Sequence, residues 1–117
     1  MSVELLLKDG DYVPDGKGGF RTVSGAEEVL QRALFLLTAR RGSFPFLPEL
    51  GSRLYLLPRE KPGARAALAQ RYAAEALAGE QGVEVTGVEC AETGPGALHI
   101  RVRMTWRGAE LEAEMEV

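Results

Sequence analysis

The chain has 117 residues, of which 45% are hydrophobic and 26% charged, and its net charge is −3. This length suits one domain, residues 1–117, with a core of its own. The acidic balance argues against general affinity for nucleic acid or an anionic membrane. No apolar run reaches bilayer-spanning length, and the N-terminus lacks the basic region of a signal peptide, so residence in a cytosol is expected. Cys90 is the single cysteine, which rules out an intrachain disulfide.

Residues 1–23 are predicted to form a strand, Glu4 to Lys8, followed by an irregular hairpin. The turn signals DGDY and PDGKGG bracket its short apolar pieces. The glycines do not fit a phosphate-binding loop, because five residues separate Gly10 from Gly16 and Gly18 stands where Ser or Thr should bind magnesium. We therefore interpret this region as ordinary turn chemistry.

Residues 24–78 are predicted to be helical on both sides of a turn at 40–57. Ser24 and Glu27 have the spacing of a capping box, which marks the start of the first helix. Its apolar face is widened by Phe35 and Leu36, and this predicts a central helix that is packed from two sides. The remaining face residues are Ala26, Val29, Leu30, Ala33, Leu34 and Leu37. A second, alanine-rich helix is predicted from Pro62 to Ala78.

The 40–57 turn reads RRGSFPFLPELGSRLYLL. Gly42, preceded by two arginines, is typical of the end of a helix, and Pro45 and Pro48 hold the chain extended. The apolar residues between them predict a turn packed onto a core. Gly51 ends this turn, and both glycines are expected at positive φ. Ser52 is predicted to cap a short helix through Leu57 that Pro58 stops.

Residues 82–117 are predicted to form a three-stranded antiparallel meander. A phase slip at Thr86-Gly87 indicates a β-bulge in the first strand. The second strand alternates strictly from Leu98 to Trp106, and a loop at Gly108-Ala109 leads to the last strand. In that register the charged residues face each other across the hairpin: Arg107 with Glu110, Thr105 with Glu112, Arg103 with Glu114 and Arg101 with Glu116. The predicted fold class is therefore α+β, with a helical layer packed on a small antiparallel C-terminal sheet and an N-terminal strand and hairpin.

The turn resembles the baseplate wedge, or sheath-initiator, family of contractile phage tails, which includes W-like wedge proteins and a baseplate subunit of type VI secretion. The family pattern is a helix ending in Leu-Thr, a Gly-Ser step, then Pro-x-x-Gly-Ser and a leucine-rich short helix. The matching positions here are Leu37, Thr38, Gly42, Ser43, Pro48, Gly51, Ser52 and Leu54. The likeness covers roughly residues 24 to 117.

The resemblance implies a structural protein that links the baseplate wedge to the first sheath ring and nucleates sheath assembly. Its partners would be other wedge proteins and the tail sheath protein, with no cofactor, metal, small-molecule substrate, nucleic acid or membrane. It would assemble in the host cytoplasm and reside in the tail baseplate of a phage or phage-like particle. One departure stands at Glu80-Gln81-Gly82, where the family often carries Glu-Pro-Arg at a wedge contact.

The last strand, residues 109–117, is expected to present the docking edge or to complete the sheet that presents it, since sheath subunits of this family interlock by donating strands. Its edge residues would be Glu110, Glu112, Glu114, Glu116 and Val117. The glutamates would fix the register and discourage pairing with a second copy.

Two functions from other classes remain as alternatives. A muralytic enzyme needs two carboxylates beside a cleft, and the sequence offers Glu27, Glu28, Glu49 and Glu60 by count only. A nucleic-acid binder would use Arg101, Arg103 and Arg107, which the acidic neighbouring strand should neutralise. Cys90 and His99 are expected on opposite faces of the sheet, which argues against a catalytic pair.

Overall fold

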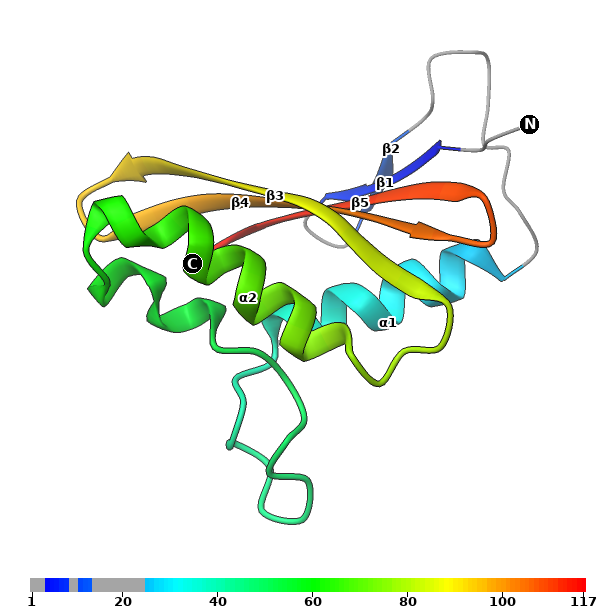
Figure 1. The fold of residues 1–117 in the computed structure, drawn as a ribbon, viewed down its shortest axis with the longest axis horizontal. Helices are drawn as coiled ribbons and strands as arrows, with labels where there is room; N and C mark the ends of the chain where they lie inside the picture. The colour runs from blue at the N-terminus through cyan, green and yellow to red at the C-terminus, as the bar shows by residue number, and fades with distance from the viewer. Residues whose placement is uncertain (1–3, 9–10, 14–24) are drawn as a thin grey trace.

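The computed structural model describes residues 4–8, 11–13 and 25–117. Helices lie on one side of a twisted sheet, so the predicted α+β architecture is confirmed (Figure 1). The elements in chain order are β1 (Glu4–Lys8), β2 (Asp11–Val13), α1 (Ala26–Thr38), the 3₁₀ helices η1 (Leu54–Arg59) and η2 (Pro62–Ala64), α2 (Arg65–Leu77), β3 (Val83–Gly94), β4 (Ala97–Trp106) and β5 (Ala109–Glu116).

The strands form one sheet in the order β2-β1-β5-β4-β3. The predicted antiparallel meander of β3, β4 and β5 and the predicted strand Glu4–Lys8 are confirmed. That strand pairs antiparallel with β2, which was not predicted, and residues 14–24 of the predicted hairpin region lie outside the described residues. In addition, β1 runs parallel to β5, with Glu4 opposite Glu110 and Lys8 opposite Glu114. The first of the two possibilities for the last strand, that it presents a sheet edge, was therefore wrong, because β5 has a strand on each side from Glu110 to Glu114.

The turn between β4 and β5 lies at Arg107-Gly108 and not at Gly108-Ala109. Trp106 pairs with Ala109, which leaves two loop residues with φ of 48° and 80°. A two-residue hairpin loop of this kind requires positive φ at both positions, and glycine supplies the second at little cost. The predicted loop would have required Ala109 to adopt that conformation instead.

The hairpin register is consequently shifted by two residues from the predicted one. Arg103 lies opposite Glu112, Arg101 opposite Glu114, and His99 opposite Glu116. A shift of two keeps every side chain on its predicted face, because the side-chain period of a strand is two. The apolar residues of both strands thus still face the helices, although each meets a different partner.

The predicted bulge in β3 is confirmed by a register shift between Val85 and Gly87 opposite β4. The strand carries a second irregularity between Glu92 and Gly94. Within the described residues β3 has a strand neighbour on one side only, and it forms one edge of the sheet.

Helix α1 ends earlier and has a narrower buried face than predicted. Thr38 is its last residue, and Ala39 turns into extended backbone at φ −66° and ψ 137°, so Gly42 lies beyond the helix. Its buried residues pack against β5, α2 and β1, whereas Phe35 is 51% exposed. Phe35 therefore does not widen the buried face as predicted. Ser24 of the predicted capping box lies outside the described residues.

Helix α2 covers the β3 half of the same sheet face. The predicted helix is confirmed except for its first turn, which is the 3₁₀ helix η2 beginning at Pro62. Ala69 and Ala73 are fully buried, and such small side chains permit close approach of the helix to its neighbours. The core lies between the two helices and the inner face of β3, β4 and β5.

Candidate interaction surfaces

The segment between α1 and η1 leaves the body of the protein and returns to the point where it left (Figure 1). Backbone hydrogen bonds close its base, from the Ser52 amide to the Ala39 carbonyl at 2.8 Å and from the Arg41 amide to the Ser52 carbonyl at 3.0 Å. The buried Ser52 hydroxyl donates to the Leu37 carbonyl at 2.5 Å and accepts from the Leu54 amide at 3.2 Å. The segment is therefore a loop with a fixed base.

The predicted positive φ angles of Gly42 and Gly51 are confirmed at 89° and 99°. A Cβ atom on Gly51 would lie 2.5 Å from the Ala39 carbonyl oxygen, whereas nothing lies within 4 Å of the same position on Gly42. The first glycine is thus required only by backbone conformation. The second is required by conformation and by the close approach of the two chain segments at the loop base.

The resemblance positions gather mainly at this base. Thr38 ends α1 and donates its hydroxyl to the Leu34 carbonyl at 2.8 Å, and Leu54 is fully buried. Gly42, Ser43 and Pro48 are exposed, and Pro48 lies at the tip of the loop. The short helix η1 differs from its prediction, because Arg53 occupies the cap position and the helix continues through Pro58.

Charged side chains surround the loop base. Glu75 of α2 lies 3.5 Å from Arg41 and 3.6 Å from Arg53, measured between carboxylate oxygen and guanidinium nitrogen. The Arg40 guanidinium stacks over the Tyr55 ring at 5.1 Å from its centre. Ionic and cation–π contacts thus add to the hydrogen bonds that fix the base, and two of them reach α2.

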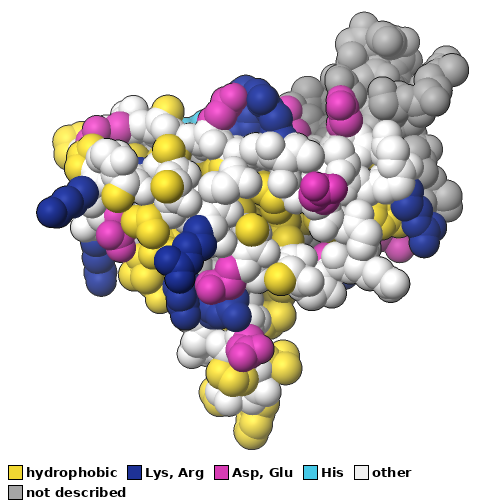
Figure 2. Space-filling model, in the orientation of Figure 1, with side chains coloured by type: hydrophobic (Ala, Val, Ile, Leu, Met, Phe, Trp, Pro, Cys, Tyr) yellow, Lys and Arg dark blue, Asp and Glu magenta, His cyan; other side chains and the backbone are white. Residues whose placement is uncertain are grey.

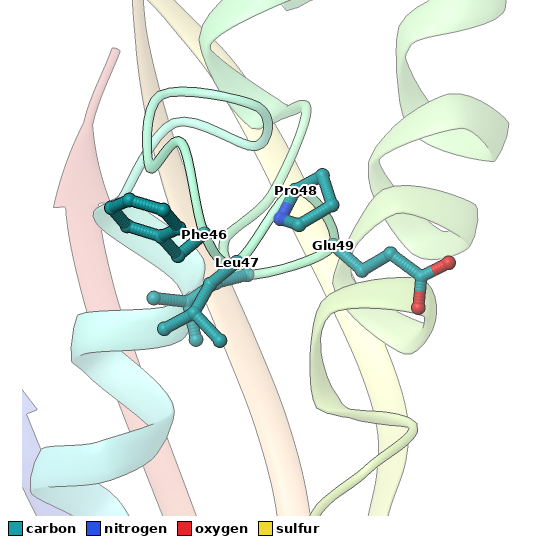
Figure 3. A pocket seen from close by; sticks show the side chains of 5 residues that line it. Phe46, Leu47, Pro48 and Glu49 are labelled. Atoms are coloured by element: carbon teal, nitrogen blue, oxygen red, sulfur yellow. The ribbon is translucent and has the colours of Figure 1, made fainter.

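The tip of the loop is apolar and exposed, which contradicts the prediction that it packs onto a core. Phe46 is 94% exposed, Leu47 57% and Phe44 36%. Figure 2 shows hydrophobic side chains covering most of the projection, with lysine and arginine side chains near its junction with the body. Figure 3 shows a shallow hollow at the tip, lined by Phe46, Leu47, Pro48, Glu49 and Leu50.

Two hydrogen-bonded turns shape the tip from within. The Leu47 amide donates to the Phe44 carbonyl and the Leu50 amide to the Leu47 carbonyl, both at 3.1 Å. Pro45 and Pro48 remove further backbone freedom. Sequence reasoning missed the exposure of this tip because it treated apolar composition as a sign of burial, although the prolines already indicated a stiff loop.

The outer face of the sheet carries an ion-pair network centred on Arg101. Its Nε and Nη2 lie 2.9 and 2.8 Å from Oε1 of Glu114, whose side chain is only 5% exposed. It also lies 2.7 Å from Glu112 and 3.6 Å from Glu89. Arg103 shares the last two partners. The predicted neutralisation of these arginines within the sheet is therefore confirmed.

Arg107 lies outside this network and stacks over the Trp106 ring at 4.8 Å. It stands in the hairpin turn, beyond the paired arginines of β4. The three arginines of the nucleic-acid alternative therefore do not form one free basic patch.

His99 lies beside two carboxylates at the far end of the hairpin. Its Nδ1 is 2.7 Å from Glu116 and its Nε2 is 3.6 Å from Glu114. The hydrogen bond to Glu116 is the main cause that raises the pKa of His99, against a smaller lowering by burial. The Glu116 side chain also accepts from Thr93 of β3 at 3.5 Å. Sequence reasoning missed this contact because it placed Glu116 opposite Arg101.

In the pairing of β3 with β4, Cys90 lies opposite Ile100 and His99 lies opposite Ala91. Because successive residues of a strand point to opposite faces, Cys90 and His99 lie on opposite faces of the sheet, as predicted. Burial raises the pKa of the Cys90 thiol despite the nearby Arg65. A thiol with a raised pKa is a poor nucleophile at neutral pH.

The remaining docking residues are distributed along β5 and at its end. Glu110 to Glu116 pair with β4, and Glu110 to Glu114 also pair with β1. Val117 exchanges two backbone hydrogen bonds of 2.9 Å with Leu98. The backbone from Glu110 to Glu114 is thus paired on both sides, and Glu116 and Val117 are paired with β4.

Glu80-Gln81-Gly82 form the connection from α2 to β3. Glu80 lies 3.3 Å from Arg32 of α1, so it joins the two helices. Gly82 has a φ of 80°, and a Cβ atom there would lie 3.4 Å from the Trp106 ring. Gly82, which stands where the family often has arginine, thus allows the backbone to pass close to the Trp106 ring.

Two carboxylates of the muralytic alternative, Glu27 and Glu28, lie far from a third, Glu49. Glu27 and Glu28 are in the first turn of α1, whereas Glu49 is in the loop beyond its last residue. A 13-residue helix is about 20 Å long at 1.5 Å per residue. Paired glycosidase carboxylates lie about 5 to 9.5 Å apart. Glu60, the fourth candidate, directly follows η1.

Within residues 4–8, 11–13 and 25–117, no group of three or more His, Cys, Asp and Glu side chains is placed to hold a metal ion. Among the helices of residues 25–117, none combines the length and apolarity that crossing a membrane demands.

Comparisons with known proteins give a likeness in fold. No protein-family profile matches the sequence, and no curated protein does. Among solved structures, a crystal structure from Geobacter sulfurreducens, named a candidate tail lysozyme, superposes with a TM-score of 0.64. The two share 18% sequence identity over 85% of this chain and 95% of the other. The chain thus has the fold of the Geobacter protein.

Proposed function

We propose that the protein is a structural subunit of a contractile tail baseplate, in a phage or phage-like particle. In this role it links the wedge to the first sheath ring and nucleates sheath assembly. The observation that carries the proposal is the fixed loop base, where hydrogen bonds through the Ser52 side chain join Leu37, Ser52 and Leu54, three positions of the resemblance pattern. The fold likeness to a protein named a candidate tail lysozyme adds support from an independent direction.

The contact to sheath is assigned to β3 and no longer to β5. In the described part of the chain β3 has an unpartnered side, and an incoming strand can add its backbone hydrogen bonds there. The bulge at Val85–Gly87 interrupts the regular pattern near one end of β3. The stretch from Val88 to Glu92 pairs regularly with β4 and is the part suited to a donated strand.

Gene deletion tests this proposal in a strain that produces contractile particles. Electron microscopy should then show tail tubes without sheath, and expression of the wild-type chain in trans should restore sheathed tails. Immunogold against a tagged chain should label the tail end where the baseplate lies. Sheathed, contractile tails in the deletion strain would overturn the proposal.

A muralytic enzyme is the second candidate, because the structural neighbour is named a candidate tail lysozyme. The separation of Glu27 and Glu28 from Glu49 weighs against an acid–base pair among them. Purified protein should release nothing from peptidoglycan above a Glu49→Gln control. Reproducible release that this substitution abolishes would replace the structural proposal with the enzymatic one.

A further inference from the structure

The exposed side chains of the loop tip are of the type that dominates protein interfaces. Phe46 and Leu47 leave most of their surface in water, and Phe35 of α1 is half exposed beside Phe44, with 6.4 Å between ring centres. Exposing such groups is unfavourable, at roughly 25 cal/mol per Å² of apolar surface. Buried aromatic anchors commonly supply much of the binding energy of an interface. The tip therefore has the composition of a binding element.

The loop is also organised before any partner arrives. Its base is closed by the Ser52 and Arg41 hydrogen bonds, and its tip by the turns at Phe44 and Leu47. Binding by such a loop loses less conformational entropy than binding by an unstructured segment. This rigidity distinguishes the loop from an apolar stretch that is merely unpacked.

The distribution of charge indicates the chemistry of the partner. Glu49 is the single ionised side chain from Gly42 to Leu50 and makes no ion pair with the described residues. Figure 3 shows it projecting from the loop on the side away from Phe46. At the base, Arg41 and Arg53 both lie beside Glu75, and Arg40 stacks over the Tyr55 ring. The free charge of the tip is thus negative.

A membrane fits this pattern poorly. Loops and helices that insert at bilayer surfaces combine apolar side chains with free lysines and arginines, which anionic lipids attract. Here the tip carries a carboxylate. A symmetric contact between two copies would bring their Glu49 carboxylates together, which like-charge repulsion disfavours.

We propose that residues 43–50 form a preformed plug that binds in an apolar cleft of a partner protein. Phe46 and Leu47 enter the cleft, and Glu49 pairs with a lysine or arginine at its rim. That the partner is a wedge protein of the same baseplate rests on the proposed function. The plug lies apart from the β3 edge assigned to sheath, so the two contacts can be separated by mutation.

The test is binding of the purified full chain to the wedge proteins encoded in the same tail gene cluster. The variants are Phe46→Ser/Leu47→Ser and Glu49→Lys, with Glu110→Lys as the control for an exposed glutamate elsewhere. The double variant should weaken the complex by about tenfold or more, and Glu49→Lys by about threefold or more, whereas the control should not change it. All variants should keep the wild-type melting temperature, because the altered side chains are exposed.

Four results would overturn the plug. One is a wedge complex that the double variant leaves unchanged. The others are binding of phosphatidylcholine–phosphatidylserine vesicles, or self-association in sedimentation, that the double variant abolishes while no wedge protein binds. Absence of any complex, vesicle binding or self-association by the wild-type chain would overturn it as well. Immunogold labelling of particles is scored separately, so failure of the plug is distinguishable from failure of the baseplate assignment.

Discussion

The Ser52 hydroxyl donates a 2.5 Å hydrogen bond to the carbonyl oxygen of Leu37, 15 positions earlier in the chain. Leu37 is in the last turn of α1, where carbonyl groups have no partner within the helix. Ser52 therefore supplies a helix-end contact from the far side of the loop. This bond fixes the end of α1 and the base of the loop together.

Replacing Ser52 with alanine should destabilise the protein by about 1–3 kcal/mol, because two buried backbone groups lose a partner. Those groups are the Leu37 carbonyl and the Leu54 amide. Ser43→Ala is the matched control, since its hydroxyl donates to the Arg40 carbonyl at 2.6 Å but is exposed. That control should change the free energy of unfolding by less than about 0.5 kcal/mol. Equal urea midpoints for the two variants would contradict the prediction.

Gly51→Ala should be costlier than Gly42→Ala. Both residues have positive φ, which costs a side-chain-bearing residue about 1–2 kcal/mol. At Gly51 the added Cβ also meets the Ala39 carbonyl oxygen, so the two segments at the loop base must separate. Thermal unfolding of both variants tests the order, and a Gly42 variant that melts at the lower temperature would refute it.

Arg101→Ala should destabilise the fold by about 2 kcal/mol, less than the 3–5 kcal/mol for a fully buried pair, because Arg101 is partly exposed. The substitution removes two short contacts to the nearly buried Glu114. Arg103→Ala is the control, as it breaks only exposed pairs and should cost about 0.2–1 kcal/mol. A double-mutant cycle with Glu114→Gln measures the coupling. Additive effects of Arg101→Ala and Glu114→Gln would show that the pair does not contribute.

The contribution of His99 to the free energy of unfolding should fall as the pH rises from 6 to 8. The Glu116 carboxylate raises the pKa of His99 in the folded protein. The stabilisation is fully present below the unfolded pKa, about 6.5, and is lost as the pH rises through the higher folded pKa. Urea unfolding of the wild type and His99→Gln at both pH values isolates this contribution. The upper limit of pH 8 keeps the Cys90 thiol protonated. An equal slope in the variant would exclude His99 as its source.

The hairpin illustrates what an alternating pattern can and cannot predict. Leu111 and Met115 face the core in the predicted register and in the observed one, because the two differ by a full period. Alternation therefore predicted the faces correctly and left the partners open. The choice was made by the turn, where Arg107 accepts a φ of 48° so that Gly108 can occupy the second loop position.

The loop illustrates a different limit. Gly42 and Gly51 were predicted correctly because positive φ is a local property that glycine reveals. The exposure of Phe46 was not predicted, since the burial of a side chain depends on which other parts of the chain pack near it. The parallel pairing of β1 with β5 was missed for a related reason. The two strands are far apart in the chain, and nothing in the residues of β1 indicates which strand it pairs with.

The pairing of Glu4 with Glu110 also orders events on the ribosome. β1 is synthesised before every other described element, and the strand that it must join is synthesised after them all. Non-local pairing of this kind closes a long loop at an entropic cost and is slow. Until β5 is available, β1 presents the amides and carbonyls on its side away from β2 to other chains. β5 thus completes the meander and, in the same step, covers the side of β1 that β2 leaves unpaired.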